Sequence, residues 1–146
     1  KILIEECVEG REIECAVLGN HCPQASGLGE IRVAQGFYSY KAKYIDENEA
    51  ILDVPAILPP EIAERMRTVA VEAHQTLACE GMSRVDFFLR EDGEILVNEL
   101  NSIPGFTQIS MFPRLWEVAG ISYSELIHRL IQLAVERFEE EKSLET

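Results

Sequence analysis

The stretch that decides the fold is SRVDFFLREDGEILVNELN, which runs from Ser83 to Asn101. Apolar and polar residues alternate on both sides of Asp92-Gly93, a pattern typical of two strands joined by a turn. A two-residue loop at Asp92-Gly93 would pair Asp86 with Glu99. The same register would pair Arg84 with Asn101. The sequence therefore predicts a β-hairpin that carries four polar side chains on one face.

The opposite face of this hairpin is expected to pack into the core. It is interrupted only at Asn98, and its apolar members are Val85, Phe87, Leu89, Leu96 and Leu100. Upstream, the alternation from Ile13 to Leu18 is only loose, which suits a strand that is covered on both faces.

Two facing carboxylates in a sheet point to a bound cation. Directly opposed residues have Cβ atoms roughly 5 Å apart, so Asp86 and Glu99 would repel each other unless a positive charge lies between them. With Asn101 they form an all-oxygen donor set, which favours Mg²⁺ or Mn²⁺ over zinc. Arg84 beside them would stabilise phosphoryl oxygens. The pattern alone leaves a second interpretation open, a solvated face whose acids pair with Arg84 or with lysines.

The loop after the hairpin contains Pro104-Gly105 and small hydroxyl residues, and such a loop can offer backbone N–H groups to an anion. Together with this loop, the motifs of the hairpin resemble the C-terminal half of the ATP-grasp D-alanine:D-alanine ligases. The resemblance extends from Lys1 to about Phe138. The segments that carry it are Arg84-Val85-Asp86, Val97-Asn98-Glu99-Leu100-Asn101, Pro104-Gly105-Phe106-Thr107 and Ser110.

The resemblance implies an α+β fold, the C-terminal subdomain of an ATP-grasp domain, with a largely antiparallel sheet and helices packed on one face. Residues 1–146 would form one unit. Within it, residues 1–19 would be strands of the nucleotide pocket, residues 34–56 a mobile lid loop, and residues 83–110 the metal-binding hairpin and loop.

The resemblance also implies a nucleotide site near the N-terminus of the chain. The segment that contains Glu5, Cys7 and Val8 would line the adenine pocket, and Glu12 would hold the ribose hydroxyls. Without the family, Glu12 would be read as an exposed glutamate near a turn.

Second-substrate residues are implied in the same way. Lys43 and Ser110 would bind the carboxylate of the second amino acid, and Tyr44 would lock the lid by hydrogen bonding. Taken alone, Lys43 is equally a solvated lysine and Tyr44 a surface aromatic residue.

The implied activity is the ATP-dependent joining of two D-alanines through an acyl phosphate, for peptidoglycan precursor synthesis in the cytoplasm. Asp86, Glu99 and Asn101 would hold two Mg²⁺ (or Mn²⁺) ions, while Arg84 and the backbone N–H of Gly105 would stabilise the tetrahedral intermediate. The alternatives are a ligase that uses D-lactate, a non-catalytic nucleotide- or metal-binding module, and an α+β domain whose acids are merely solvated.

Composition is compatible with this function. The chain has 146 residues, 47% of them hydrophobic and 27% charged, and a formal net charge of −13. The negative charge argues against nucleic acid or an anionic membrane as partner, and no apolar run is long enough to span a bilayer. The four cysteines show no Cys-x-x-Cys spacing and are expected to be reduced thiols.

The chain begins without methionine, directly in an apolar segment, and is expected to be a fragment of a longer polypeptide. Its expected partners are ATP, D-alanine, the N-terminal half of the same protein and, at full length, a second copy in a homodimer. The fragment alone is expected to be inactive. Scaffold helices are predicted after Pro59-Pro60, around residues 112–119, and after the capping box Ser122 to Glu125.

Overall fold

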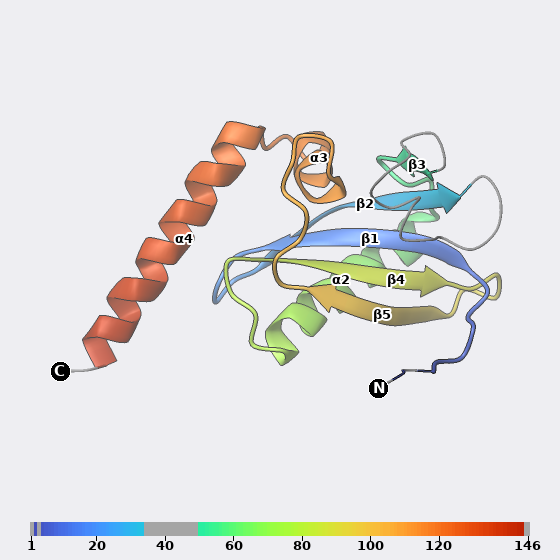
Figure 1. Ribbon diagram of the computed structural model, residues 1–146, viewed down its shortest axis with the longest axis horizontal. Coiled ribbons are helices and arrows are strands. Elements are labelled where there is room, and N and C mark those ends of the chain that lie inside the picture. The colour runs from blue at the N-terminus through green and yellow to red at the C-terminus, as the bar shows by residue number, and fades with distance from the viewer. Residues whose placement is uncertain (1, 3, 34–49, 145–146) are drawn as a thin grey trace.

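The protein is described here by a computed structural model that covers residues 2, 4–33 and 50–144. Five antiparallel strands form one sheet in the order β3-β2-β1-β4-β5 (Figure 1). The strands are β1 (Arg11–Leu18), β2 (Gln24–Val33), β3 (Ala50–Asp53), β4 (Met82–Leu89) and β5 (Ile95–Asn101), and the helices are α2 (Pro60–Thr76), α3 (Met111–Val118) and α4 (Tyr123–Leu144). The predicted α+β class and the antiparallel sheet are confirmed.

One face of the sheet packs against α2. Alternate residues of β1 point to this side, and Ile13, Cys15 and Val17 are completely buried there. The helix contributes Met66 and Ala70 to the same cluster. Pro59 is the N-cap of α2, and Pro60 occupies the first helical position, where a missing N–H is harmless.

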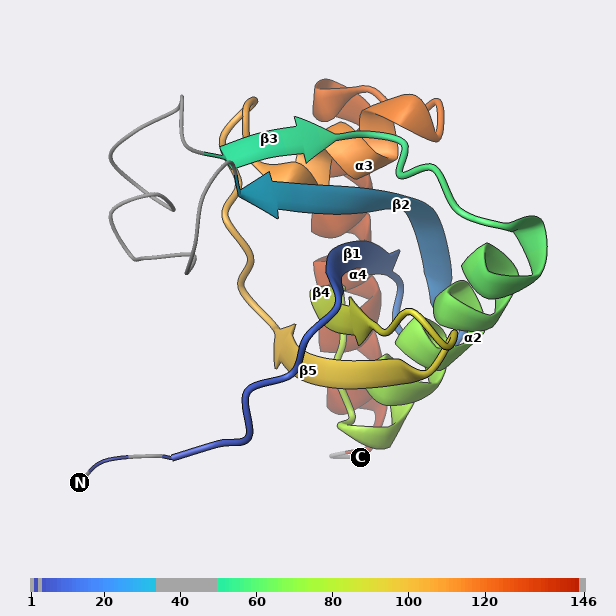
Figure 2. The same cartoon turned by 90° about the vertical axis from the view of Figure 1, so that its right-hand side faces the viewer.

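The other face packs against α3 and the start of α4. The intervening residues of β1, Ala16 and Leu18, join a second buried cluster with Phe112, Leu115 and Leu126. The expectation that the helices pack on one face is therefore corrected: they cover both faces, as a view turned by 90° also shows (Figure 2). The reason is that β1 is apolar on both sides along its second half.

The β4–β5 hairpin turns through three residues, not two. Arg90 N–H donates to Glu94 O at 3.0 Å, and Gly93 N–H donates to Arg90 O at 3.0 Å. Gly93 has a φ of 86°, which suits the left-handed position of a three-residue loop. The loop is therefore Glu91-Asp92-Gly93, one residue longer than expected.

A second irregularity restores the predicted pairing at the far end of the hairpin. Phe87 pairs with Val97, but Asp86 pairs with Glu99, so β5 contains one extra residue between these pairs. Such a bulge shifts the register by one. Asp86 opposite Glu99 and Arg84 opposite Asn101 are thus confirmed, although the two-residue turn from which they were derived is wrong.

The bulge also changes which residues of β5 face the core. Leu96 pairs with Phe88 and lies on the opposite face from the one expected. Ile95 and Leu100 are the residues of β5 that pack against the α2-side cluster.

Helix α4 has little support from the sheet. Leu126 is its only buried residue among those described. Asn20 ties it to the β1–β2 connection, donating from Nδ2 to Leu133 O at 3.0 Å. None of the described helices is both long and apolar enough to cross a membrane.

Candidate functional site

Three carboxylates form a row across neighbouring strands. Glu14 on β1 is paired with Asp86 on β4, which is paired with Glu99 on β5. Adjacent strands lie about 4.8 Å apart, so these side chains share one face at close spacing. The next pair on the same face of β4 and β5 is Arg84 and Asn101. The term polar row is used below for all five residues: Glu14, Asp86, Glu99, Arg84 and Asn101.

Arg84 is the cation at the centre of the polar row. Its Nε donates to Asp86 Oδ1 at 2.7 Å and its Nη2 donates to Asp86 Oδ2 at 2.7 Å. The same Nε lies 3.0 Å from Glu14 Oε2. All three residues are buried, with 9% of Arg84, 8% of Asp86 and 4% of Glu14 exposed.

The electrostatic balance keeps Arg84 charged. Burial by itself lowers the pKa of the guanidinium, but its hydrogen bonds to Asp86 and the charges of Glu14, Asp86 and Glu99 outweigh that effect and raise the pKa. A single guanidinium faces three carboxylates across this row, so the local charge is negative and favours an added cation.

Asn101 joins the two outer carboxylates. Its Nδ2 donates to Asp86 Oδ2 at 3.1 Å and to Glu99 Oε1 at 3.3 Å. The carboxylates of Asp86 and Glu99 therefore converge on the amide group of Asn101. A half-turn of that amide would exchange its nitrogen for its oxygen, and three oxygen donors would then face one point.

This donor set fits a hard divalent cation. Carboxylate and amide oxygens are ligands that Mg²⁺ and Mn²⁺ prefer. Within residues 2, 4–33 and 50–144, no three His, Cys, Asp or Glu side chains are arranged to hold a metal ion. A cation here would therefore depend on the Asn101 oxygen as well as on Asp86 and Glu99.

The loop between β5 and α3 brings two more predicted residues together. Ser110 Oγ accepts a hydrogen bond from Thr107 N–H at 3.1 Å, and Ser110 N–H donates to Thr107 O at 2.9 Å. A Cβ placed on Gly105 would lie 3.2 Å from Ser110 Oγ, closer than an ordinary contact. The lack of a side chain at Gly105 thus lets the loop backbone approach Ser110, which directly precedes α3.

The predicted nucleotide residues divide into two groups. Glu12 lies on β1 two residues before Glu14, and therefore on the same face as the polar row. Glu5, Cys7 and Val8 precede β1 in a segment that leaves the sheet (Figure 2); Glu5 and Cys7 are exposed and Val8 is half-buried. Lys43 and Tyr44 lie outside the described residues.

Sequence reasoning missed Glu14. Its position was marked by one signal, a charged residue between the apolar Ile13 and Cys15 in the middle of a strand. The partner of that strand could not be read from the sequence, because β1 and β4 are joined through two other strands and a helix.

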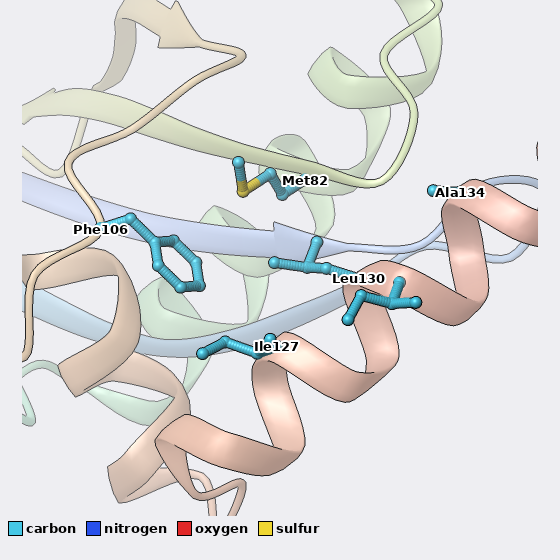
Figure 3. Close-up of a pocket in the computed structure, with 6 residues that line it drawn as sticks. Met82, Phe106, Ile127, Leu130 and Ala134 are labelled. Atoms are coloured by element: carbon cyan, nitrogen blue, oxygen red, sulfur yellow. The ribbon is translucent and has the colours of Figure 1, made fainter.

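An apolar groove of about 310 Å³ lies between α4 and the sheet (Figure 3). It is lined by Met82, Phe106, Ile127, Leu130, Ile131 and Ala134. None of these side chains is charged and none belongs to the polar row, so the groove offers nothing to a phosphate or a cation.

Comparison with known proteins finds similarity to one family over most of the chain. Residues 1–132 match the family model described as "D-ala D-ala ligase C-terminus". The chain is 56% identical over 146 residues to a D-alanine–D-alanine ligase of Shouchella clausii, covering all of this chain and 40% of that protein. The chain therefore spans about 40% of the length of this curated relative.

Solved structures give the same result. A D-alanine–D-alanine ligase from Coxiella burnetii aligns with a TM-score of 0.82 at 38% identity, over 96% of this chain and 36% of that one. A ligase from Bacillus anthracis, solved in complex with ATP, aligns with a TM-score of 0.77 at 32% identity, over 94% and 43% of the two chains.

Proposed function

The chain belongs to the D-alanine–D-alanine ligase family, and from that membership we propose that it is the part of a longer ligase that holds the reacting phosphoryl group while ATP drives the joining of two D-alanines. The observation that carries the proposal is the polar row, in which Asp86, Glu99 and Asn101 converge beside Arg84.

Asp86, Glu99 and Asn101 would hold two Mg²⁺ or Mn²⁺ ions. Such ions neutralise charge on the phosphates of ATP as the phosphoryl group moves. The Asn101 amide would turn its oxygen towards the ion, since in this structure its nitrogen contacts both carboxylates.

Arg84 and Gly105 would stabilise the developing oxyanion. The contacts of Arg84 with Asp86 use Nε and Nη2, so the Nη1 end of the guanidinium lies on its other side, where it can donate to an anionic oxygen. The Gly105 backbone N–H would be a second donor, and one such donor typically contributes about 3 kcal/mol to lowering a barrier.

The remaining predicted residues would bind substrates. Glu12 would hold the ribose hydroxyls of ATP, on the face that carries the polar row. Ser110, together with Lys43, would bind the carboxylate of the second D-alanine, and Tyr44 would close over it. The segment with Glu5, Cys7 and Val8 would border the adenine.

Because the chain spans 40% of the curated relative, the other ligase functions would be supplied by the rest of the polypeptide. That part would bind the first D-alanine and the α- and β-phosphates. The complete enzyme would act as a homodimer in the cytoplasm, in peptidoglycan precursor synthesis.

The test is phosphate release by the full-length protein. Release is expected only when ATP, Mg²⁺ and D-alanine are all present, with D-alanyl-D-alanine as product and no ester product when D-lactate is supplied. Asp86→Asn is expected to lower kcat on the order of 100-fold or more, because a cation ligand and a partner of Arg84 are altered together.

Asp92→Asn is the matched control, since Asp92 is an exposed aspartate in the same hairpin and asparagine is well tolerated in turns. Its kcat should stay within about twofold of the parent. Phosphate release without D-alanine, or near-normal turnover of Asp86→Asn at saturating Mg²⁺, would contradict the proposal.

A further inference from the structure

Glu14 is a buried carboxylate that the proposed function leaves without a role. It lies on the central strand β1 with 4% of its surface exposed. Its neighbours in the row are Asp86 on one side and Gly29 on the other. Its Oε2 lies 3.0 Å from Arg84 Nε, the same nitrogen that donates to Asp86 Oδ1.

A cation at Asp86 would compete with Arg84. Both oxygens of Asp86 accept hydrogen bonds from the guanidinium, so a cation bound to Asp86 would weaken at least one of them. If Asp86 were the sole anchor, Arg84 would be free to change rotamer when the cation arrives. Glu14 is a second anchor, supplied by a different strand.

We propose, on the basis of the ligase function above, that Glu14 is a positioning residue: its ion pair with Arg84 Nε remains when Asp86 engages the cation, so that the guanidinium keeps its direction. Its effect on the reaction passes through Arg84. A displacement of about 1 Å in such a group can cost roughly 100-fold in rate, so this anchor is expected to affect kcat.

Glu30 shows what a glutamate with a purely structural partner looks like in this sheet. It is also buried, with 7% exposed, and it accepts two hydrogen bonds from Arg11, at 2.8 Å and 2.6 Å. Arg11 also donates to Ile57 O at 3.0 Å, which ties the sheet to the segment before α2. Glu30 pairs with Ile13, on the α2 face and away from the polar row.

Stability alone does not require a carboxylate at position 14. Burying a charge is costly, and replacing a buried ion pair with apolar residues is often neutral or stabilising. The neighbouring position on the same face of β1 is Ala16, which is fully buried in an apolar cluster. A glutamate between this cluster and the polar row therefore points to a function for its charge.

The experiment uses the full-length ligase with Glu14→Gln and Glu14→Ala, and with Glu30→Gln as the matched control. Gln keeps the length of the side chain and one acceptor oxygen, so kcat is expected to fall roughly threefold to tenfold, whereas Ala removes the anchor and should lower kcat about 100-fold. The KM for ATP should stay within about twofold in each case, because Arg84 would act on the transition state. Glu30→Gln should leave kcat unchanged.

A second readout does not depend on turnover. The rate at which phenylglyoxal modifies Arg84, followed by peptide mass analysis without D-alanine, should rise at least about threefold in Glu14→Ala and remain unchanged in Glu30→Gln, since only Glu14→Ala removes a contact of the Arg84 guanidinium. Thermal unfolding of each variant reports whether the fold is retained, and Glu14→Gln serves if Glu14→Ala does not fold.

The inference is overturned if Glu14→Ala keeps kcat within about twofold of the parent, if Arg84 labelling does not change, or if Glu30→Gln lowers kcat as much as Glu14→Gln. A parent that releases no phosphate with D-alanine would overturn the proposed function instead, and the labelling would still decide whether Glu14 holds Arg84.

Discussion

The two faces of the sheet are made by alternate residues of the same strands, and they have opposite characters. On the α2 face, Ile13, Cys15 and Phe87 are at most 1% exposed and belong to one hydrophobic cluster. On the other face, Glu14 and Asp86 occupy the intervening positions and are nearly as buried. A shift of one residue in register would exchange the two sets. The period of the strand thus places Ile13 and Cys15 on one face and the residues of the proposed site on the other.

The largest expected effect on stability comes from the α2 face. Phe87→Ala should destabilise the chain by about 3–5 kcal/mol, because it removes a buried ring from the centre of the core. Asp86→Asn, one position away, should cost about 1–3 kcal/mol, since Arg84 keeps its contact with Glu14. Urea unfolding of the two variants measures both values.

The difference between the faces would be refuted by equal losses in the two variants. In the full-length enzyme the order should reverse: Asp86→Asn should abolish most turnover, while any Phe87→Ala protein that remains folded should keep its kcat.

Gly29 tests the border between the polar row and the apolar cluster on the same face. It is paired with Glu14, and a Cβ there would lie 2.6 Å from Met111 Sδ and 3.2 Å from Leu115 Cδ2. Gly29→Ala should therefore cost about 1–3 kcal/mol by overpacking. Met111 is flexible, so the double variant with Met111→Ala should recover part of the loss. Thermal unfolding of both variants checks this, and a neutral Gly29→Ala would show that α3 is not tightly packed on the sheet.

The site could be predicted from the sequence to the extent that its contacts are local. Asp86, Glu99, Arg84 and Asn101 belong to one hairpin. Alternation places Asp86 and Arg84 on one face of β4, and Glu99 and Asn101 on one face of β5, while the register of the hairpin decides whether these faces coincide. The three-residue turn and the bulge were both missed, because neither leaves a distinctive residue pattern. Each of them shifts the register by one residue. Their effects cancel at Asp86, so the site pairing was predicted correctly.

The remaining features depend on contacts between distant segments. Glu14 meets Asp86 only because β1 pairs with β4, and no turn of defined length fixes that register. The placement of α3 on the second face follows from Ala16 and Leu18, which the loose alternation in this strand hinted at but could not assign to a helix. Long-range pairing is set by tertiary packing rather than by local propensity.

The next expected effect is on the pH dependence of stability, and it comes from a buried histidine on the α2 face. His74 is completely buried, with Nδ1 2.7 Å from Ser83 Oγ and Nε2 3.2 Å from Gly19 O. Burial lowers its pKa, so the unfolded chain binds a proton that the folded chain does not. Stability should therefore fall as the pH drops below about 6.5, the ordinary histidine value.

Comparison of the urea midpoints of the parent and of His74→Gln between pH 7.5 and pH 5.5 isolates this contribution, and the variant should show the weaker fall. The stability contribution of His21 depends on pH in the opposite direction. Glu140 raises the pKa of His21, so this stabilisation is present at low pH and is lost as the pH rises through the raised pKa. Because His21 is fully exposed, its part should be small. Equal slopes in parent and variant would contradict the role given to His74.

The smallest expected effect comes from an ion pair at the exposed end of the hairpin. Arg90 Nη1 donates to Glu94 Oε2 at 2.9 Å, with 36% and 48% of the two side chains exposed. Like the buried pair of Arg84 and Asp86, this pair joins an arginine to a carboxylate, but here solvent screens the two charges. A double-mutant cycle with Arg90→Gln and Glu94→Gln should give a coupling of about 0.2–1 kcal/mol that weakens with added salt. Neither variant should change kcat in the full-length enzyme. A coupling as large as that of Arg84 and Asp86 would mean that burial does not determine the strength of the ion pairs in this hairpin.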